Sequence, residues 1–390
     1  MVRMAPDLPW GATDRCAEFA APLERFLRAA SELRQDQSME FLSGIVKTLA
    51  DTWASVEAAL AGSPSLAGIG LMLAVGAGLA IAVLALAGLV RLLFAMRRGA
   101  VAKGIKKQNE IGARIVVVRG GGGRRSTIAG FLHKSVDTHL KEYMFGGPFA
   151  VISYPGSLEG DARAQQLLTR TEADVILWAE APRGTKGCAR ILARPTNTFE
   201  PPRAAVTLAM PKEKSTWNEA LARAMAYAAA KQFRPALGRP QDFRAERLQP
   251  VVESVLSILS QKPKADPALL AEMVDDSSAG ALQLAFAGDD AWIDKSVEIA
   301  RSTLGEINRS AAPDRWIAAN ITLGRALRLK AEKRFDPVML REGIAHLTEA
   351  LEALRSEPRL KLAESAAQAI GEAQKLLGTR RKFSISGGGI

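Results

Sequence analysis

A run of 25 residues without a charge, from Leu66 to Val90, constrains this chain more than any other feature. It reads LAGIGLMLAVGAGLAIAVLALAGLV and is followed by Arg91. As a helix rising about 1.5 Å per residue it would be about 37 Å long, enough to cross the apolar core of a bilayer with some tilt. The sequence therefore predicts a transmembrane helix over residues 64–96.

A cleaved signal peptide is the alternative interpretation of this run. Signal peptides begin near the amino terminus and have a shorter apolar region, whereas about 60 residues precede this one. In that region, residues 1–63, apolar side chains recur at helical spacings between Cys16 and Ala61. We expect two amphipathic helices there, placed before the membrane segment.

Basic residues crowd the carboxyl side of the run. The formal net charge of the chain is +11, and seven basic residues against the single acid Glu110 lie between Arg91 and Arg114. Residues 97–110 are expected to form a basic juxtamembrane linker attracted to anionic headgroups. Its membrane-surface candidates are Arg97, Arg98, Lys103, Lys106 and Lys107.

This charge bias gives the helix a direction. Because lysine and arginine are retained on the cytoplasmic side, the carboxyl-terminal domains are expected inside a single-pass protein of the bacterial inner membrane. The bias also accounts for the net charge without nucleic acid, for which the sequence offers no recognition motif.

Small residues repeat every four positions along the membrane segment, as in Gly70, Ala74 and Gly78. Such a face lets two helices approach closely, so a homo-oligomer through the transmembrane helix is one expectation. The alternative is that glycine and alanine are simply common in such helices.

Residues 111–233 show the pattern of a small α/β domain with a mixed sheet. Strands are predicted at Ile115–Val118, Phe149–Tyr154, Asp174–Glu180, Cys188–Ala193 and Ala204–Ala209. Helices are predicted over Ser126–Tyr143 and Gly160–Arg170, and a third begins at a capping box formed by Thr216 and Glu219.

Three segments of this domain carry a family resemblance. They are AQQLLTRTEADVILWAEA from Ala164 to Ala181, the following CARILARP, and the trailing WNEALARAMAYAAAKQF. With these the domain resembles the TolB amino-terminal and FlgO-like domains, although Ala179 stands where those domains usually have glycine. The resemblance implies a binding or assembly domain without a catalytic constellation.

A glycine-rich loop, RGGGGRRST, lies between the first strand and the first helix of this domain. It departs from a Walker motif, because Gly123 is followed by Arg124 and Arg125 rather than by lysine and serine. Backbone amides in such a loop can still hold an anion, and a connecting turn is the simpler interpretation. The anion-site candidates are Gly120, Gly121, Gly122, Gly123, Arg124 and Arg125.

The sequence does not indicate an enzyme or a cofactor. The cysteines are Cys16 and Cys188, on opposite sides of the membrane segment, and His133 and His139 fall on different faces of one predicted helix. We therefore predict no catalytic residues, no metal site and no cofactor.

Residues 234–250 contain three prolines and are predicted to be a linker. Residues 251–378 are expected to be helical, and residues 379–390 to be a disordered tail. Asp266 before Pro267 marks a helix start. Further helices are predicted at Asp290–Asn308, Asp314–Lys333, Pro337–Arg355 and Arg359–Leu377.

The offsets of small residues in these helices resemble tetratricopeptide repeats. Leu323-Gly324 matches the Leu-Gly pair of a first repeat helix, Gly343, Leu347 and Ala350 have the spacing of a second, and Ile370-Gly371 restarts the pattern. An ordinary helical bundle is the alternative. Only the repeat predicts a concave groove for a protein partner, with Asn320, Arg325 and Arg328 as candidate contacts.

These patterns predict a membrane-anchored α+β multidomain protein. It would have one transmembrane helix, a small α/β domain, and a carboxyl-terminal α-helical domain of tetratricopeptide type. We expect a scaffold or adaptor that recruits protein partners. The alternative function is a nucleotide- or phospholigand-responsive membrane protein that uses the Gly120 to Arg125 loop, and a third interpretation places the body in the periplasm.

Overall fold

The computed structural model of this chain describes residues 47, 51, 66–107, 112–182, 186–195, 203–355 and 360–386. The chain divides into two compact units, one comprising Met1–Val101 with Gly121–Gly123, the other comprising Ala102–Gly120 with Arg124–Ile390. The amphipathic helices predicted between Cys16 and Ala61 lie outside the described residues, apart from Lys47 and Asp51.

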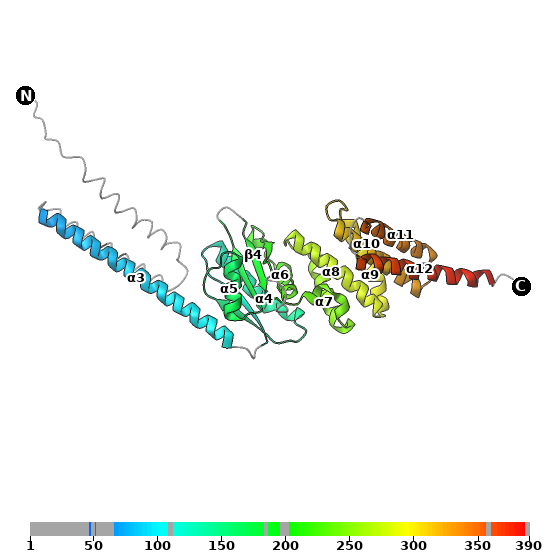
Figure 1. Ribbon diagram of the computed structural model, residues 1–390, viewed down its shortest axis with the longest axis horizontal. Coiled ribbons are helices and arrows are strands. Elements are labelled where there is room, and N and C mark those ends of the chain that lie inside the picture. Colours follow the sequence, from blue (N-terminus) through cyan, green and yellow to red (C-terminus); the bar gives the residue numbers. More distant parts are fainter. Residues whose placement is uncertain are drawn as a thin grey trace, which may run out of the picture. The chain divides into compact units, whose positions relative to one another are not determined.

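The apolar run forms helix α3, Leu66–Lys107 (Figure 1). Within the described residues, α3 is the one helix that is long and apolar enough to cross a membrane, over Gly76–Lys106. The helix does not end near Met96, where the sequence analysis placed a linker. It continues through RRGAVAKGIKK, which contains no proline, past Gly99 and Gly104 to Lys107.

A five-stranded mixed sheet with the order β2-β1-β3-β4-β5 follows. Strands β1, β2 and β3 are parallel, and β4 and β5 join antiparallel to them. The strands are β1 Ala113–Val118, β2 Phe149–Tyr154, β3 Val175–Glu180, β4 Cys188–Ala193 and β5 Val206–Ala209. The α+β class and the mixed sheet agree with the sequence prediction.

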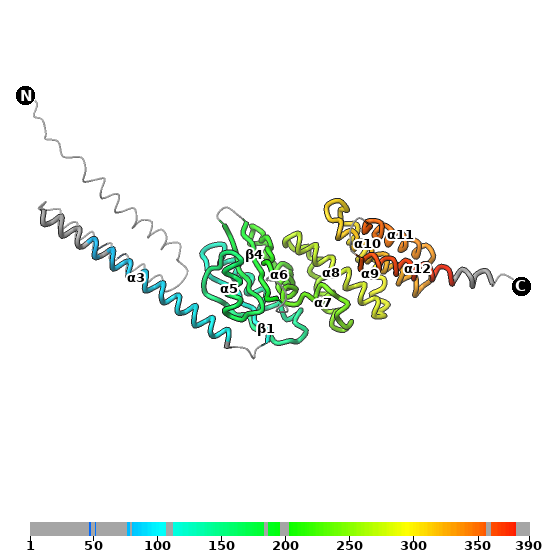
Figure 2. Tube along the Cα trace, in the orientation of Figure 1, coloured from blue at the N-terminus to red at the C-terminus, as the bar shows by residue number. Residues whose placement is uncertain are grey.

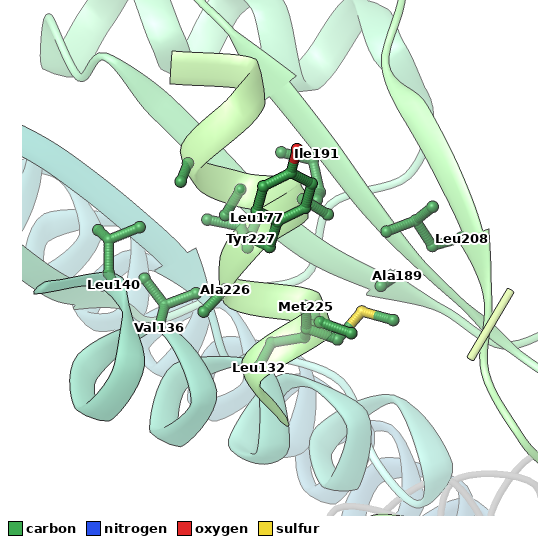
Figure 3. Close-up of a cluster of buried hydrophobic side chains, with 14 of the residues drawn as sticks. Leu132, Val136, Leu140, Leu177, Ala189, Ile191, Leu208, Met225, Ala226 and Tyr227 are labelled. Carbon is green, nitrogen blue, oxygen red and sulfur yellow. The ribbon is translucent and has the colours of Figure 1, made fainter. Parts of the chain in front are cut away.

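Helices α4 (Arg124–His139) and α6 (Glu219–Phe233) cover one face of the sheet, and their apolar side chains form a core with it. In Figure 3, side chains of α4 and α6 meet those of β3, β4 and β5 in this core. Helix α5, Asp161–Thr171, follows β2 and contacts β3 and β4. The 3-10 turn η2, Leu140–Tyr143, follows α4.

Two sequence-based boundaries in this region need correction. The cap of α6 is Asn218, whose side chain accepts a hydrogen bond from the Leu221 amide. The predicted capping residue Thr216 instead ends the 3-10 turn η3, Lys214–Thr216. Asparagine caps a helix as well as threonine does. Asn218 takes the role because it directly precedes the first residue of α6, Glu219.

The segment 234–250 is built into the core instead of forming a separate linker. It contains the 3-10 turns η4 (Pro235–Gly238) and η5 (Pro240–Asp242) and the first residues of α7, Ala245–Ser260. Leu237 is buried in the same cluster as the sheet, with Val251 and Val255 of α7. Pro250 lies inside α7, early enough that the helix loses one backbone bond without ending.

Five further helices pack in a stack, with α10 in contact with the four others (Figures 1 and 2). They are α8 Pro267–Phe286, α9 Asp290–Glu306, α10 Pro313–Lys333, α11 Pro337–Leu354 and α12 Leu360–Ser386. Asp266 caps α8, with its side chain accepting from the Ala268 amide as predicted. Helix α12 passes Thr379, where the sequence predicted disorder to begin.

Candidate functional site

The strongest candidate for a binding surface is a depression of about 610 Å³ on the helical stack, which we call the α8/α10/α12 groove. Its lining comes from three helices that are not consecutive in the chain. The lining residues are Phe286 of α8, Arg328, Leu329 and Glu332 of α10, and Glu372, Lys375, Leu376 and Thr379 of α12.

The packing order of the stack explains why these helices share a surface. Helix α10 contacts α8 and α12 directly, while α9 packs against α8 and α10, and α11 against α10 and α12. Every second helix therefore belongs to one layer. This alternation is the arrangement of stacked helix pairs, in which one layer lines an extended surface.

Two arginines lie beside the single aromatic ring of the groove. The guanidinium of Arg325 is centred 4.9 Å from the Phe286 ring, and that of Arg328 is 5.8 Å from it. Arg328 also pairs with Glu372 at 2.8 Å and with Glu332 at 3.4 Å. Burial and the charge of Arg328 lower the pKa of Arg325, so this side chain is held partly desolvated.

Arg328 has one donor without a partner among the described residues. Its Nε–H is buried and, within the described part of the chain, donates no hydrogen bond. Arg325 has its ring contact with Phe286 but no ion pair to a described carboxylate. Of the three predicted contacts, Arg328 lines the groove and Arg325 lies beside its Phe286 ring.

Asn320, the third predicted contact, is not accessible. It is fully buried, its Nδ2 donates to the Trp316 carbonyl at 2.9 Å, and its Oδ1 lies 2.9 Å from Nδ1 of His346. Asn320 therefore links α10 to α11. A buried amide must find such partners, and this requirement outweighs its placement on a helical wheel.

The glycine-rich loop is packed into the protein at both ends. Gly120 touches the backbone of Gly156 so closely that no Cβ atom could fit, and the Arg119 amide donates to the Tyr154 carbonyl at 3.0 Å. Gly121 and Gly123 have positive φ values of 116° and 61°. The glycines thus meet the needs of a tight turn between β1 and α4.

Both arginines after the loop are engaged by the protein itself. Arg124 donates to three backbone carbonyls, those of Lys186 at 2.6 Å, Pro211 at 2.8 Å and Lys212 at 2.9 Å. Its guanidinium also lies over the Trp217 ring at 5.9 Å. Arg125 pairs with Glu159 at 2.9 Å. Both guanidinium groups are therefore held by groups of the protein itself.

The membrane-surface candidates lie on the last turns of α3. Arg97, Arg98, Lys103 and Lys106 are exposed, and Lys107 ends the helix. Lys106 pairs with Glu172 at 2.8 Å, and this hydrogen bond lowers the pKa of the Glu172 carboxyl. Of the described side chains in this set, those of Arg97, Arg98 and Lys103 are therefore left for headgroups.

Most polar atoms of a second cluster on the sheet are paired within the protein, although the buried Nε–H of Arg190 has no partner among the described residues. Arg190 pairs with Asp161 and Glu180 and lies over the Trp178 ring at 5.5 Å. Glu180 also accepts from Trp178 Nε1 at 2.8 Å and from the Gly160 amide at 3.1 Å. These contacts join the start of α5 to the β3–β4 hairpin.

Among the described residues, no group of three or more His, Cys, Asp or Glu is arranged to hold a metal ion.

No protein-family model, curated protein or solved structure matches this chain. The resemblances to TolB amino-terminal domains and to tetratricopeptide repeats therefore rest on sequence motifs and stay predictions.

Sequence reasoning missed five of the groove residues that matter most, namely Phe286, Leu329, Glu372, Lys375 and Leu376. The sequence would indicate these residues only if the helices were first aligned as repeating pairs. Residues of the first helix of each pair then fall on one surface.

Proposed function

We propose that this chain is a membrane-anchored adaptor that captures a protein partner in the α8/α10/α12 groove. The observation that carries the proposal is the alternation of the helical stack, which brings α8, α10 and α12 into one layer. Layers of this kind bind peptide segments or helices along an extended surface.

The chemistry of the groove favours a peptide segment of mixed character. Phe286, Leu329 and Leu376 offer apolar contact, while Lys375 offers positive charge beside the Arg328–Glu372 ion pair. Lys375, which is exposed and lines the groove, offers its ammonium to acceptor groups. A segment that presents an apolar side chain next to a carboxylate satisfies both requirements.

Helix α3 supplies the anchor in this proposal. Its window from Gly76 to Lys106 has the length and composition of a membrane span, and its exposed basic residues fit anionic headgroups. The charge bias supports a chain that crosses the bacterial inner membrane once, with the sheet and the helical stack in the cytoplasm.

A charge reversal on the groove tests partner capture. The full chain is purified in mild detergent from its own cells, and the captured proteins are compared between the wild type, Lys375→Glu and the matched control Lys361→Glu. Both lysines are exposed on α12, but only Lys375 lines the groove. The proposal expects a defined partner that is lost with Lys375→Glu and retained with Lys361→Glu.

The same partner captured equally by the wild type and by the Lys375→Glu chain would refute the groove as the binding surface. Competition with a synthetic peptide from the recovered partner, measured by fluorescence anisotropy, then locates the bound segment.

The anchor and its direction are tested separately. A chain held by α3 should stay in the membrane pellet after alkaline carbonate washing. A reporter that works only in the cytoplasm should be active when it is fused after Ile390. Release by carbonate would contradict the anchor, and a reporter active only in the periplasm would contradict the orientation.

No second function is proposed from the Gly120 to Arg125 loop. The specific observation against it is that Arg124 is bound by three carbonyls and Arg125 by Glu159.

A further inference from the structure

Among the residues that the structure describes, the outer edge of strand β2 is open. Strand β2 is the end strand of the described sheet and pairs there only with β1. The Ala113 amide donates to the Pro148 carbonyl and the Arg119 amide to the Tyr154 carbonyl, each at 3.0 Å. Since strand backbone groups alternate in direction, the groups of Phe149, Val151 and Ser153 point away from β1.

These outward groups meet no partner in the part of the chain that the structure describes. The backbone hydrogen bonds outside regular pairing include none from Phe149, Val151 or Ser153. Residues 149–152 are half-buried and Ser153 is exposed. The edge therefore presents three amides and three carbonyls to whatever lies beside it.

The opposite edge of the sheet is protected, which makes the open edge of β2 distinctive. Strand β5 has only four residues, and its Ala209 amide donates to a carboxylate oxygen of Asp266 at 2.7 Å. Short length and an inserted acid are devices that keep an edge strand from pairing with another chain. Strand β2 has neither device, and it contains no proline, no charge and no bulge.

The charges around β2 are compatible with a second copy of the same strand as the occupant. The 16 residues from Tyr143 to Leu158 are free of charge and are bounded by Glu142 and Glu159, in a chain with 24% charged residues. Antiparallel pairing about Val151 places each Glu opposite an uncharged residue, so no like charges meet. Two copies of this strand can therefore pair without charge repulsion between them.

From this edge we infer that two copies of the chain associate by antiparallel pairing of their β2 strands, with the two Val151 residues opposite each other. In this register Phe149 of each copy lies opposite Ser153 of the other. Because all three residues direct both backbone groups outward, the pair forms about six backbone hydrogen bonds. The two sheets then join into one, and the inference does not depend on the α8/α10/α12 groove.

Ser153 is the position at which to test this association. Its side chain is exposed, so a change there leaves the core intact. A lysine at an edge position blocks pairing, while threonine keeps the hydroxyl and favours a strand. The full chain in detergent is measured by light scattering with Ser153→Lys and, as the matched control, Ser153→Thr.

We expect the wild type and the Ser153→Thr chain to be dimers, and Ser153→Lys to weaken self-association by about tenfold or more. Val151→Pro provides a second test, since its amide points outward and proline is tolerated at such an edge position. Circular dichroism checks that each variant is folded.

Hydrogen exchange resolved to single residues identifies the surface directly. In the dimer the amides of Phe149, Val151 and Ser153 are protected, and in Ser153→Lys they exchange while those of Ala150 and Ile152, which face β1, stay protected. A monomeric wild type would overturn the inference. So would a dimer that Ser153→Lys leaves intact, which would point to pairing through α3 or to another surface.

Discussion

Gly324 of α10 and Gly343 of α11 pack directly against each other, with no space for a side chain between the helices. A Cβ atom on Gly324 would lie 2.8 Å from the carbonyl oxygen of Gly343 and 2.6 Å from Cγ of Leu347. Leu347 is fully buried in the cluster that joins α10, α11 and α12. The spacing of the helical stack therefore depends on this pair of glycines.

Replacing Gly324 by alanine is expected to destabilise the chain by about 1 to 3 kcal/mol, the usual cost of overpacking a closely packed interior. Gly371→Ala is the matched control, because Gly371 also lies inside a helix but has nothing within 4 Å of its Cβ position. There alanine should be neutral or stabilise by up to about 1 kcal/mol. Chemical unfolding followed by circular dichroism measures both, and equal midpoints would contradict the packing.

The contrast between these glycines also shows how far sequence reasoning reaches. Gly324, Gly343 and Gly371 all match the repeat pattern, but only the first two separate neighbouring helices. A pattern of small residues indicates that a helix could pack closely against a neighbour. It does not record whether a further helix follows, and within the described chain α12 is the last.

Local signals were enough for the strands. β2 and β4 have the predicted bounds, because a short β-branched or alternating run between turn residues is a local property. Long-range contacts were not predictable. Arg124 finds its carbonyls 62 to 88 residues away in the sequence, and Asn320 bonds a histidine 26 residues away. Both residues looked available for ligands because their partners come from elsewhere in the chain.

Glu142 joins three elements, and its carboxylate should make stability depend on pH. It accepts from Ser254 Oγ at 2.9 Å and from Arg223 Nη2 at 3.1 Å, linking η2 to α7 and α6. Burial alone would raise the pKa of Glu142, but the hydrogen bonds from Ser254 and Arg223 lower it below its usual value. The ionised form is therefore the one that stabilises the fold.

A carboxyl whose pKa is lower in the folded chain contributes stability above its unfolded pKa, and that contribution is lost as the pH falls through the folded value. Glu142→Gln should lower stability by about 1 kcal/mol at about pH 7, and the difference from wild type should shrink below about pH 4. Melting temperatures across this range test it. Glu364→Gln, at an exposed position on α12, is the control and should show no such trend.

Lys231 neutralises a buried acid where α6 meets α8. Its Nζ pairs with Asp276 and, at 2.6 Å, with Glu272, and Tyr227 donates to Asp276 at 2.6 Å. Burial raises the pKa of Asp276 although Lys231 opposes the shift. Lys231→Met should raise this pKa further, because only the Tyr227 hydroxyl would remain close to the carboxylate.

Removing one partner of a buried ion pair costs about 3 kcal/mol, so Lys231→Met should be clearly destabilised at neutral pH. A carboxyl whose folded pKa is raised costs stability above its unfolded pKa, and this cost disappears when the pH falls below that value. The deficit of Lys231→Met should therefore shrink on acidification. Adding Asp276→Asn should restore most of the lost stability at neutral pH, and no restoration would exclude the buried charge as the cause.

Arg124 separates the two interpretations of the glycine-rich loop. Its planar guanidinium reaches three carbonyls at once, and a lysine ammonium cannot reproduce that geometry. If its role is to fasten the start of α4, Arg124→Lys should lower stability by about 1 to 3 kcal/mol. Arg125→Ala, which removes only the exposed pair with Glu159, should cost no more than about 0.5 kcal/mol.

Thermal unfolding with a panel of nucleotides and with inorganic phosphate completes the comparison. We expect no ligand to stabilise the wild type, and the gap between Arg124→Lys and Arg125→Ala to be the same with and without ligand. A nucleotide that stabilised the wild type and lost its effect when both arginines were replaced would restore the phospholigand function. In that case Arg124 would have to exchange its three carbonyls for the phosphate, so binding would be accompanied by movement of the segments at Lys186 and Pro211.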